Sequence, residues 1–147
     1  MAEEWKEVVA EWVGETAFIG RNLTGGSVQI GTFQDQPGLG PMELLLVGVA
    51  GCTGMDIVSI LSKKRQKIEK FEIKVRGKRA ETHPKVYTEI EVTYQLWGNQ
   101  VDPKMVEQAI HLSEEKYCSA SAMLSAVANI RSKYVIHQSS ESFIPCN

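Results

Sequence analysis

The segment from Pro41 to about Arg65 restricts the possible folds more than any other part of the sequence. Apolar side chains recur in it at the spacing of one helical face, and the cations Lys63-Lys64-Arg65 end it, where the helix dipole favours positive charge. Pro41 suits a first helical turn, because no partner is lost for its missing N–H. The segment has little polar surface before Asp56. We therefore predict a central helix that is buried on most sides.

Strand patterns stand on both sides of this helix. The first third of the chain predicts three β-strands, at Trp5–Val13, Thr16–Ile19 and Ser27–Ile30, separated by turn residues. After the helix, apolar and polar residues alternate in Phe71–Val75 and again in Ile90–Leu96. This period of two predicts an antiparallel pair of strands with one face in the core and one in water.

Two helices and a strand complete the pattern. Asp102 and Pro103 form an N-cap and a first-turn proline, which predict the start of a helix. A second short helix is predicted at Ala120–Ala128 and a last strand at Lys133–Gln138, before a polar tail over residues 139–147. Strands and helices in this order predict the α+β class.

Length and composition restrict the class of protein further. A chain of 147 residues predicts a single domain over residues 1–147. A formal net charge of −2 gives no sign of nucleic-acid binding, which favours a basic patch. The first residues lack the layout of a signal sequence, and the uncharged run Leu44–Met55 is shorter than the about 20 residues that span a bilayer. We expect no membrane partner, and three cysteines without an export signal predict the cytoplasm.

Cys52 and Cys118 lie in contexts that a loose surface thiol would not have. Cys52 is part of an apolar, Gly-rich segment, and Cys118 stands at the break before the second short helix. If the fold brings them together, the pair can cycle between dithiol and disulfide. Because a helix start favours an anion, Cys118 is predicted to be better placed for activation than Cys52, which lies beyond the first turn of its helix. The alternative for each is a small buried core residue.

The residues around both cysteines resemble a known family. The run Pro41-Met42-Glu43-Leu44 that leads to Ala-Gly-Cys52, and Lys-Tyr-Cys118-Ser before a helix of small residues, resemble the OsmC/Ohr family of thiol-dependent organic hydroperoxide reductases, most closely its YhfA-like branch. The similarity runs from about Trp5 to His137. It implies an OsmC-like fold with antiparallel sheets around a buried central helix, in an intertwined homodimer.

The resemblance also implies a reaction. Cys52 would be the peroxidatic cysteine that attacks an organic hydroperoxide. Cys118 would be the resolving cysteine that attacks the resulting sulfenic acid and closes a disulfide. A dithiol reductant, of the lipoyl type, would then reopen the pair. Cys146 matches nothing in the family.

The family's better-known branches activate the first cysteine with an arginine from the N-terminal strands, held by a glutamate before the cysteine helix. Arg21 is the sole arginine before Arg65 and stands in the matching region. A guanidinium suits this task because it stays charged, although a solvated turn residue is the alternative for Arg21. The family's glutamate position falls on Met42, and Glu43 follows one place later. Arg21 and Glu43 therefore join Cys52 and Cys118 as candidate catalytic residues.

Metal binding and small-molecule binding are the alternatives to a redox enzyme. The chain has no Cys-x-x-Cys pair and no His-Glu-x-x-His pattern, so the sequence predicts no metal and no cofactor. A dimer that binds a small molecule or senses thiol oxidation, without efficient turnover, stays open as a second function on the same fold. The departure at Met42 favours it.

Overall fold

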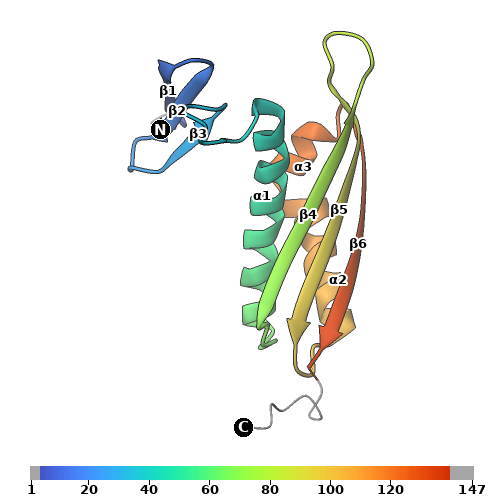
Figure 1. The fold of residues 1–147 in the computed structure, drawn as a ribbon. Coiled ribbons are helices and arrows are strands. Elements are labelled where there is room, and N and C mark those ends of the chain that lie inside the picture. The colour runs from blue at the N-terminus through green and yellow to red at the C-terminus, as the bar shows by residue number, and fades with distance from the viewer. Residues whose placement is uncertain (1–3, 140–147) are drawn as a thin grey trace. The chain divides into compact units, whose positions relative to one another are not determined.

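The computed structural model describes residues 4–139 and divides the chain into two compact units, Met1–Leu45 and Leu46–Asn147 (Figure 1). The boundary between the units falls inside the long helix α1 (Pro41–Lys63). This helix has nearly the predicted bounds, and the cation Lys63 lies in its last turn. The polar tail and Cys146 lie outside the described residues.

The first unit contains an antiparallel sheet of three strands in the order β1 (Val8–Gly14), β2 (Ala17–Asn22) and β3 (Ser27–Ile30). The side chain of Asn22 accepts the backbone N–H bonds that close the turn between β2 and β3. All three predicted strands are confirmed, although β1 begins at Val8 and not at Trp5.

The second unit contains a sheet of three strands in the order β4 (Lys70–Arg79), β5 (Tyr87–Gly98) and β6 (Asn129–Gln138). The predicted antiparallel pairing of β4 with β5 is confirmed. Strand β6 runs parallel to β5, so the expectation of antiparallel sheets is wrong for this pair. The reason is the connection: helices carry the chain from the end of β5 back to the other end of the sheet, as parallel neighbours require.

Three helical segments form this connection. Helix α2 (Pro103–Leu112) begins as predicted, with the carboxylate of Asp102 accepting the N–H of Lys104 at 2.9 Å. It continues into a π-helical turn, η1 (Ser113–Tyr117), which the sequence did not predict. Helix α3 (Ser119–Leu124) follows and is shorter than expected.

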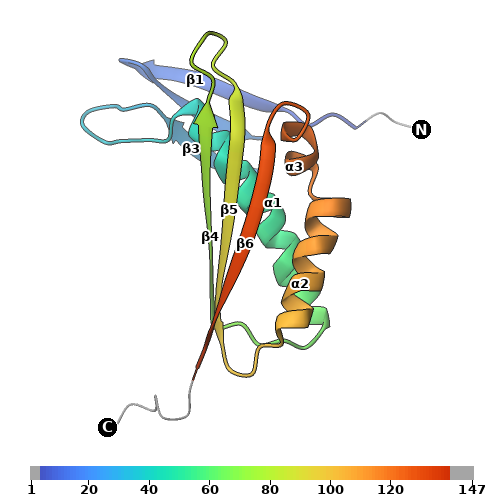
Figure 2. The same ribbon diagram turned by 90° about the vertical axis from the view of Figure 1, so that its right-hand side faces the viewer.

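Helix α2 and the part of α1 from Leu46 onward lie on the same face of the β4-β5-β6 sheet (Figures 1 and 2). A Cβ added to Gly54 of α1 would come within 2.8 Å of Ile73 Cδ1 on β4, so the missing side chain permits a close approach of helix and sheet. Full burial of one large aliphatic side chain contributes about 1.5–3 kcal/mol. The core includes the following buried side chains: Ile57, Leu61, Ile90, Val92, Tyr94, Leu96 and Val106.

Within one chain, helix α1 is buried along one side only. Its fully buried side chains recur every four residues, which places them on one narrow stripe: Val49, Thr53, Ile57 and Leu61. Other apolar side chains stay open, with Val47 50%, Val58 54% and Met55 77% exposed. The second unit's sheet and α2 therefore cover only one side of this helix.

By length and composition alone, α1 could cross a membrane. Its best 18-residue window has a mean hydropathy of 2.0, and 22% of that window is buried. The core helix of a water-soluble protein can be equally long and equally apolar. The length of the uncharged run Leu44–Met55 therefore underestimates how apolar this helix is.

The N-cap of α2 gives a direct test of this part of the fold. Asp102→Ala removes the acceptor for the Lys104 N–H and should lower the free energy of unfolding by about 1 kcal/mol. Asp102→Asn is the matched control, because an asparagine caps nearly as well and should change stability much less. Urea denaturation followed by circular dichroism measures both. Equal stability of the alanine variant and the parent protein would contradict the cap.

Candidate thiol active site

Cys52 lies about three turns past Pro41 in α1 and is half-buried. Its neighbour Thr53 is fully buried, and the Thr53 hydroxyl donates to the carbonyl of Val49 at 2.9 Å, so this part of the helix faces the sheet. Cβ positions at Gly48 and Gly51 would meet nothing within 4 Å. Cys52 therefore stands at the border between the buried stripe of α1 and its open side.

Cys118 is the N-cap of α3 and is only 3% exposed. Its Sγ accepts the backbone N–H of Ser121 at 3.4 Å and is hydrogen-bonded to Ser121 Oγ at 3.1 Å. Its own backbone N–H donates to the carbonyl of Ser113 at 2.7 Å, across the π-helical turn. Two helical segments thus fix the position of this thiol.

The structure brings the two thiols into the same region. Cys52 and Cys118 are both free, and Cys52 lies near enough to act on the pKa of Cys118. Burial raises the pKa of Cys118, the hydroxyl and backbone N–H of Ser121 lower it by smaller amounts, and the nearby Cys52 raises it further. The net direction is upward, so Cys118 rests as a protonated thiol near neutral pH.

This pKa direction corrects one sequence-based expectation. Cys118 does stand at a helix start, as predicted, and receives an N–H bond there. The expected activation is wrong, because the desolvation of a thiol that is 3% exposed outweighs the N–H bond and the Ser121 hydroxyl.

A chain of polar side chains beside the thiols was not predicted from the sequence. Tyr94 of β5 is fully buried, and its hydroxyl donates to Glu114 Oε2 at 2.7 Å. Ser132 of β6 donates to the other oxygen, Glu114 Oε1, at 3.1 Å. Burial, then the bond to Glu114, raises the pKa of Tyr94; a bond from Thr53 lowers it, and the nearby Cys118 sulfur adds to the rise.

One of these polar side chains, Tyr94, could be assigned to the core from the sequence. The alternation along β5 assigns Tyr94 to the core face, and a buried phenol needs a hydrogen-bond partner. Glu114 could not be named as that partner, because its orientation depends on η1. In this turn Ser113 is also buried and donates to Asp56 Oδ2 at 2.9 Å. A π-helical turn is uncommon and is often found at functional sites.

Arg21 and Glu43 both lie in the first unit. Arg21 is on β2 and forms an exposed ion pair with Glu11 at 2.9 Å. The carboxylate of Glu43 accepts the backbone N–H of Gly40 at 2.7 Å and thereby caps α1. Within this unit the bonds of Arg21 and Glu43 go to these two partners, and the catalytic role of either residue stays a prediction.

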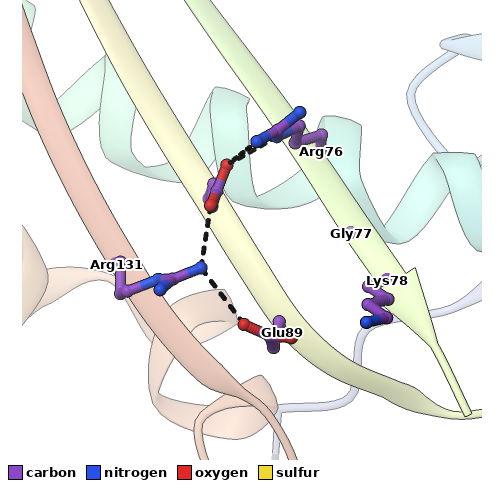
Figure 3. Close-up of a pocket in the computed structure, with 6 residues that line it drawn as sticks. Arg76, Gly77, Lys78, Glu89 and Arg131 are labelled. Atoms are coloured by element: carbon purple, nitrogen blue, oxygen red, sulfur yellow. Dashed lines mark hydrogen bonds and ion pairs between the residues drawn. The ribbon is translucent and has the colours of Figure 1, made fainter.

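Residues 4–139 contain no group of three or more His, Cys, Asp or Glu side chains that could hold a metal ion. A hollow of about 390 Å³ lies elsewhere, on the face of the β4-β5-β6 sheet opposite the helices (Figure 3). Its charges pair with one another: Glu91 binds Arg76 and Arg131 at 2.5 and 2.8 Å, and Arg131 also reaches Glu89 at 3.1 Å. These paired charges stabilise the outer face and leave the thiol pair as the candidate site.

Known proteins share this arrangement of sheets and helices. YhfA of Escherichia coli K12 is 32% identical over 126 residues, which cover 86% of this chain and 94% of YhfA. A solved structure from Aquifex aeolicus VF5 is 40% identical, with a TM-score of 0.84, and covers 94% of this chain and 100% of that one. The Organic Hydroperoxide Resistance Protein OhrB of Bacillus subtilis shares the fold at 15% identity, with a TM-score of 0.62 over 90% of this chain and 98% of OhrB.

The family described as OsmC-like protein matches residues 33–133, which include both cysteines. The expected resemblance is thereby confirmed. The fold is of the α+β OsmC-like type with two sheets and helices, and the chain belongs to the OsmC-like family.

Proposed function

We propose that this protein reduces organic hydroperoxides by cycling Cys52 and Cys118 between a dithiol and a disulfide. The observation that carries the proposal is the proximity of the two free thiols, because a disulfide can only form between sulfurs that the fold brings close together. The name of the relative OhrB, an organic hydroperoxide resistance protein, supports this substrate class.

The burial of the two thiols supports a separate role for each. Cys52 is half-buried and can be reached by a substrate, whereas Cys118 is 3% exposed and cannot. A thiolate is the attacking species, and the raised pKa of Cys118 keeps this residue protonated at rest. Cys52 is therefore the peroxidatic residue and Cys118 the resolving one.

The reaction has three steps. The Cys52 thiolate attacks the distal peroxide oxygen, the O–O bond breaks, and the alcohol leaves with a proton, so that Cys52 becomes a sulfenic acid. Cys118 then attacks this sulfur, and water leaves as the disulfide forms. A dithiol, of the lipoyl type, reduces the disulfide and is itself oxidised. The open apolar side chains of α1, such as Val47 and Met55, suit an alkyl peroxide.

The activating cation in this proposal is Arg21. Its partner Glu11 is exposed, and an exposed ion pair of this kind is worth about 0.2–1 kcal/mol, so the guanidinium can exchange partners at small cost. Glu43 stands near the family's glutamate position and holds the start of α1, which contains Cys52.

A second copy of the chain covers the open side of α1 in this proposal. Val47, Met55 and Val58 are apolar and at least half exposed, and a helix with a mean hydropathy of 2.0 needs an apolar partner. The homodimer expected from the family supplies one and makes α1 the buried central helix. The free thiols suit a reducing compartment, and we place the dimer in the cytoplasm.

A second candidate function is a dimer that binds a small molecule or senses thiol oxidation without efficient turnover. Two observations favour it: Met42 stands where the family has a glutamate, and Arg21 is paired with Glu11. Steady-state turnover of an alkyl hydroperoxide with a dithiol reductant separates the two functions.

Replacement of each cysteine tests the proposed cycle. With cumene hydroperoxide as substrate and dihydrolipoamide as reductant, Cys52→Ser should have no turnover, because the attacking sulfur is gone. Cys118→Ser should stop after one peroxide per chain with a trappable sulfenic acid on Cys52. Cys146→Ser is the matched control and should keep full activity. Turnover by Cys52→Ser, or a peroxide-induced disulfide that includes Cys146 in non-reducing mass analysis, would refute the cycle.

Replacement of Arg21 tests the activating charge. Arg21→Ala should slow peroxide attack by up to about 10²-fold, the scale seen when one charge-stabilising group is lost. Lys78→Ala, which removes an exposed cation from β4, is the control for a general charge effect. Stopped-flow measurement of sulfenic acid formation gives the rate. An unchanged rate in Arg21→Ala would assign the activation to another group and favour the binding function.

The assembly has its own test. Sedimentation at micromolar concentration should show a dimer, and its interface should bury more than about 2,000 Å² in total. Met55→Glu places a charge in the apolar contact and should convert the dimer to monomers, whereas Lys78→Glu on the outer face of the sheet should not. A parent protein that sediments as a monomer would refute this assembly.

A further inference from the structure

We propose that Asp56 is a positioning residue for the closure of the Cys52–Cys118 disulfide. Its carboxylate binds the hydroxyl of Ser113, and this bond holds the turn that precedes Cys118 against the helix that contains Cys52. The inference rests on the proposed function, because it assigns a residue to the second step of that cycle.

On helix α1, Asp56 lies one turn after Cys52. Side chains four residues apart share one face of an α-helix, with about 5–6 Å between their Cβ atoms. Both residues are half-buried. Asp56 therefore binds the neighbouring segment from the side of the helix on which Cys52 lies.

On the other side of the bond, Ser113 is connected to Cys118 through the turn η1. The Ser113 hydroxyl donates to Asp56 Oδ2 at 2.9 Å, and the Ser113 carbonyl accepts the backbone N–H of Cys118 at 2.7 Å. One residue thus binds both the helix of the first cysteine and the backbone of the second. A continuous series of one α-helical turn and two hydrogen bonds joins Cys52 to Cys118.

The surroundings of the bond suit a fixed connection. Ser113 is fully buried, so water does not compete for its hydroxyl, and a bond to a carboxylate is stronger than one between neutral groups. Asp56 also lines an open hollow of about 500 Å³, together with Lys63 and Tyr117. Because this hollow is open, replacement of Asp56 leaves no sealed cavity, and the fold should tolerate it.

The closure of the disulfide is sensitive to position. Cys118 is 3% exposed and packed in place, so it cannot search for its partner as a mobile surface thiol could. A disulfide needs Cα atoms within about 4.4–6.8 Å, and a misplacement of about 1 Å can cost about 10²-fold in rate. A bond that fixes η1 relative to α1 therefore acts directly on this step.

Asp56 takes no part in the transfer of atoms. The Cys118 sulfur bonds to the Cys52 sulfur, and the S–O bond of the sulfenic acid breaks. The hydroxyl group leaves with the Cys118 proton as water. The two sulfurs thus reach the disulfide without a further reactant.

A second bond between the helices supplies a matched comparison. Lys64 Nζ on α1 donates to Gln108 Oε1 on α2 at 3.0 Å and is exposed. Lys64 is eight residues beyond Asp56, about 12 Å along the helix and away from Cys52. Its loss should loosen the contact of the two helices but should not move the thiols.

A mixed disulfide isolates the closure from the peroxide reaction. In a Cys146→Ser background, 5,5′-dithiobis(2-nitrobenzoate) should react with the accessible Cys52 and release one coloured thiolate. Cys118 should then attack the mixed disulfide and release a second one. This second phase needs no hydroperoxide, so it reports on the inference even if the protein has no peroxidase activity.

Four variants separate the bond from other effects. Asp56→Ala and Ser113→Ala each break it and should slow the second phase by about tenfold, and the double variant should be no slower, because both changes remove one shared bond. Ser113→Ala keeps the carboxylate and should leave the first phase unchanged. Asp56→Asn keeps an oxygen acceptor and should retain most of the second-phase rate. Lys64→Met is the control and should change neither phase.

The equilibrium distinguishes positioning from a merely structural role. A tenfold fall in the effective concentration of Cys118 at Cys52 should raise the reduction potential of the disulfide by about 30 mV. Titration of Ser113→Ala in glutathione buffers measures this shift. A bond that only stabilises the fold would lower the free energy of unfolding and leave the potential unchanged.

Three results would overturn the inference: a parental second phase in Asp56→Ala and Ser113→Ala, an equal loss in Lys64→Met, or a loss in Asp56→Asn as large as in Asp56→Ala. Circular dichroism checks the fold of each variant, and Ser113→Ala decides the matter if Asp56→Ala unfolds. A parent protein without a second phase would refute both the cycle and the positioning role. A parent that closes the disulfide but reduces no hydroperoxide would refute the proposed function alone.

Discussion

The packing of α1 against the inner face of the β4-β5-β6 sheet is the interaction on which the candidate site depends. Gly54 lets the helix approach Ile73, and the same helix brings Cys52 near enough to Cys118 to act on its pKa. The second thiol is held from the other side, because Cys118 caps α3 and closes the turn η1. A disulfide needs Cα atoms within about 4.4–6.8 Å, so a small shift of either element would separate the pair.

Burial affects both Cys118 and Tyr94 at this site. It raises the pKa of Cys118 and so keeps this thiol protonated. The same burial encloses Tyr94, whose hydroxyl must then find a partner inside the protein, and Glu114 is that partner. The raised pKa of Cys118 and the internal hydrogen bond of Tyr94 thus have one cause, which is burial.

Much of the fold could be predicted because its signals are local. The period of two in β4 and β5, the Asp102 cap and the proline at the start of α1 each depend on neighbours in the sequence, and all three were confirmed. The parallel pairing of β6 and the turn η1 were not predicted, because both depend on how helices carry the chain back across the sheet. The cover of α1 depends on assembly in the same way: apolar residues indicate that a helix needs cover, but not whether one chain supplies it.

The sequence by itself determined the OsmC-like family, the α+β order of elements and the two cysteines as the candidate pair, because motifs and periodicity are carried by residues close together in the chain. Only the tertiary structure decided that Cys52 and Cys118 lie in the same region, that burial raises the pKa of Cys118, and that Tyr94 binds Glu114. It also placed Glu43 on the cap of α1 and Arg21 against Glu11. Hydrogen bonds and desolvation act over a few ångströms in space, and the fold alone decides which distant residues come that close.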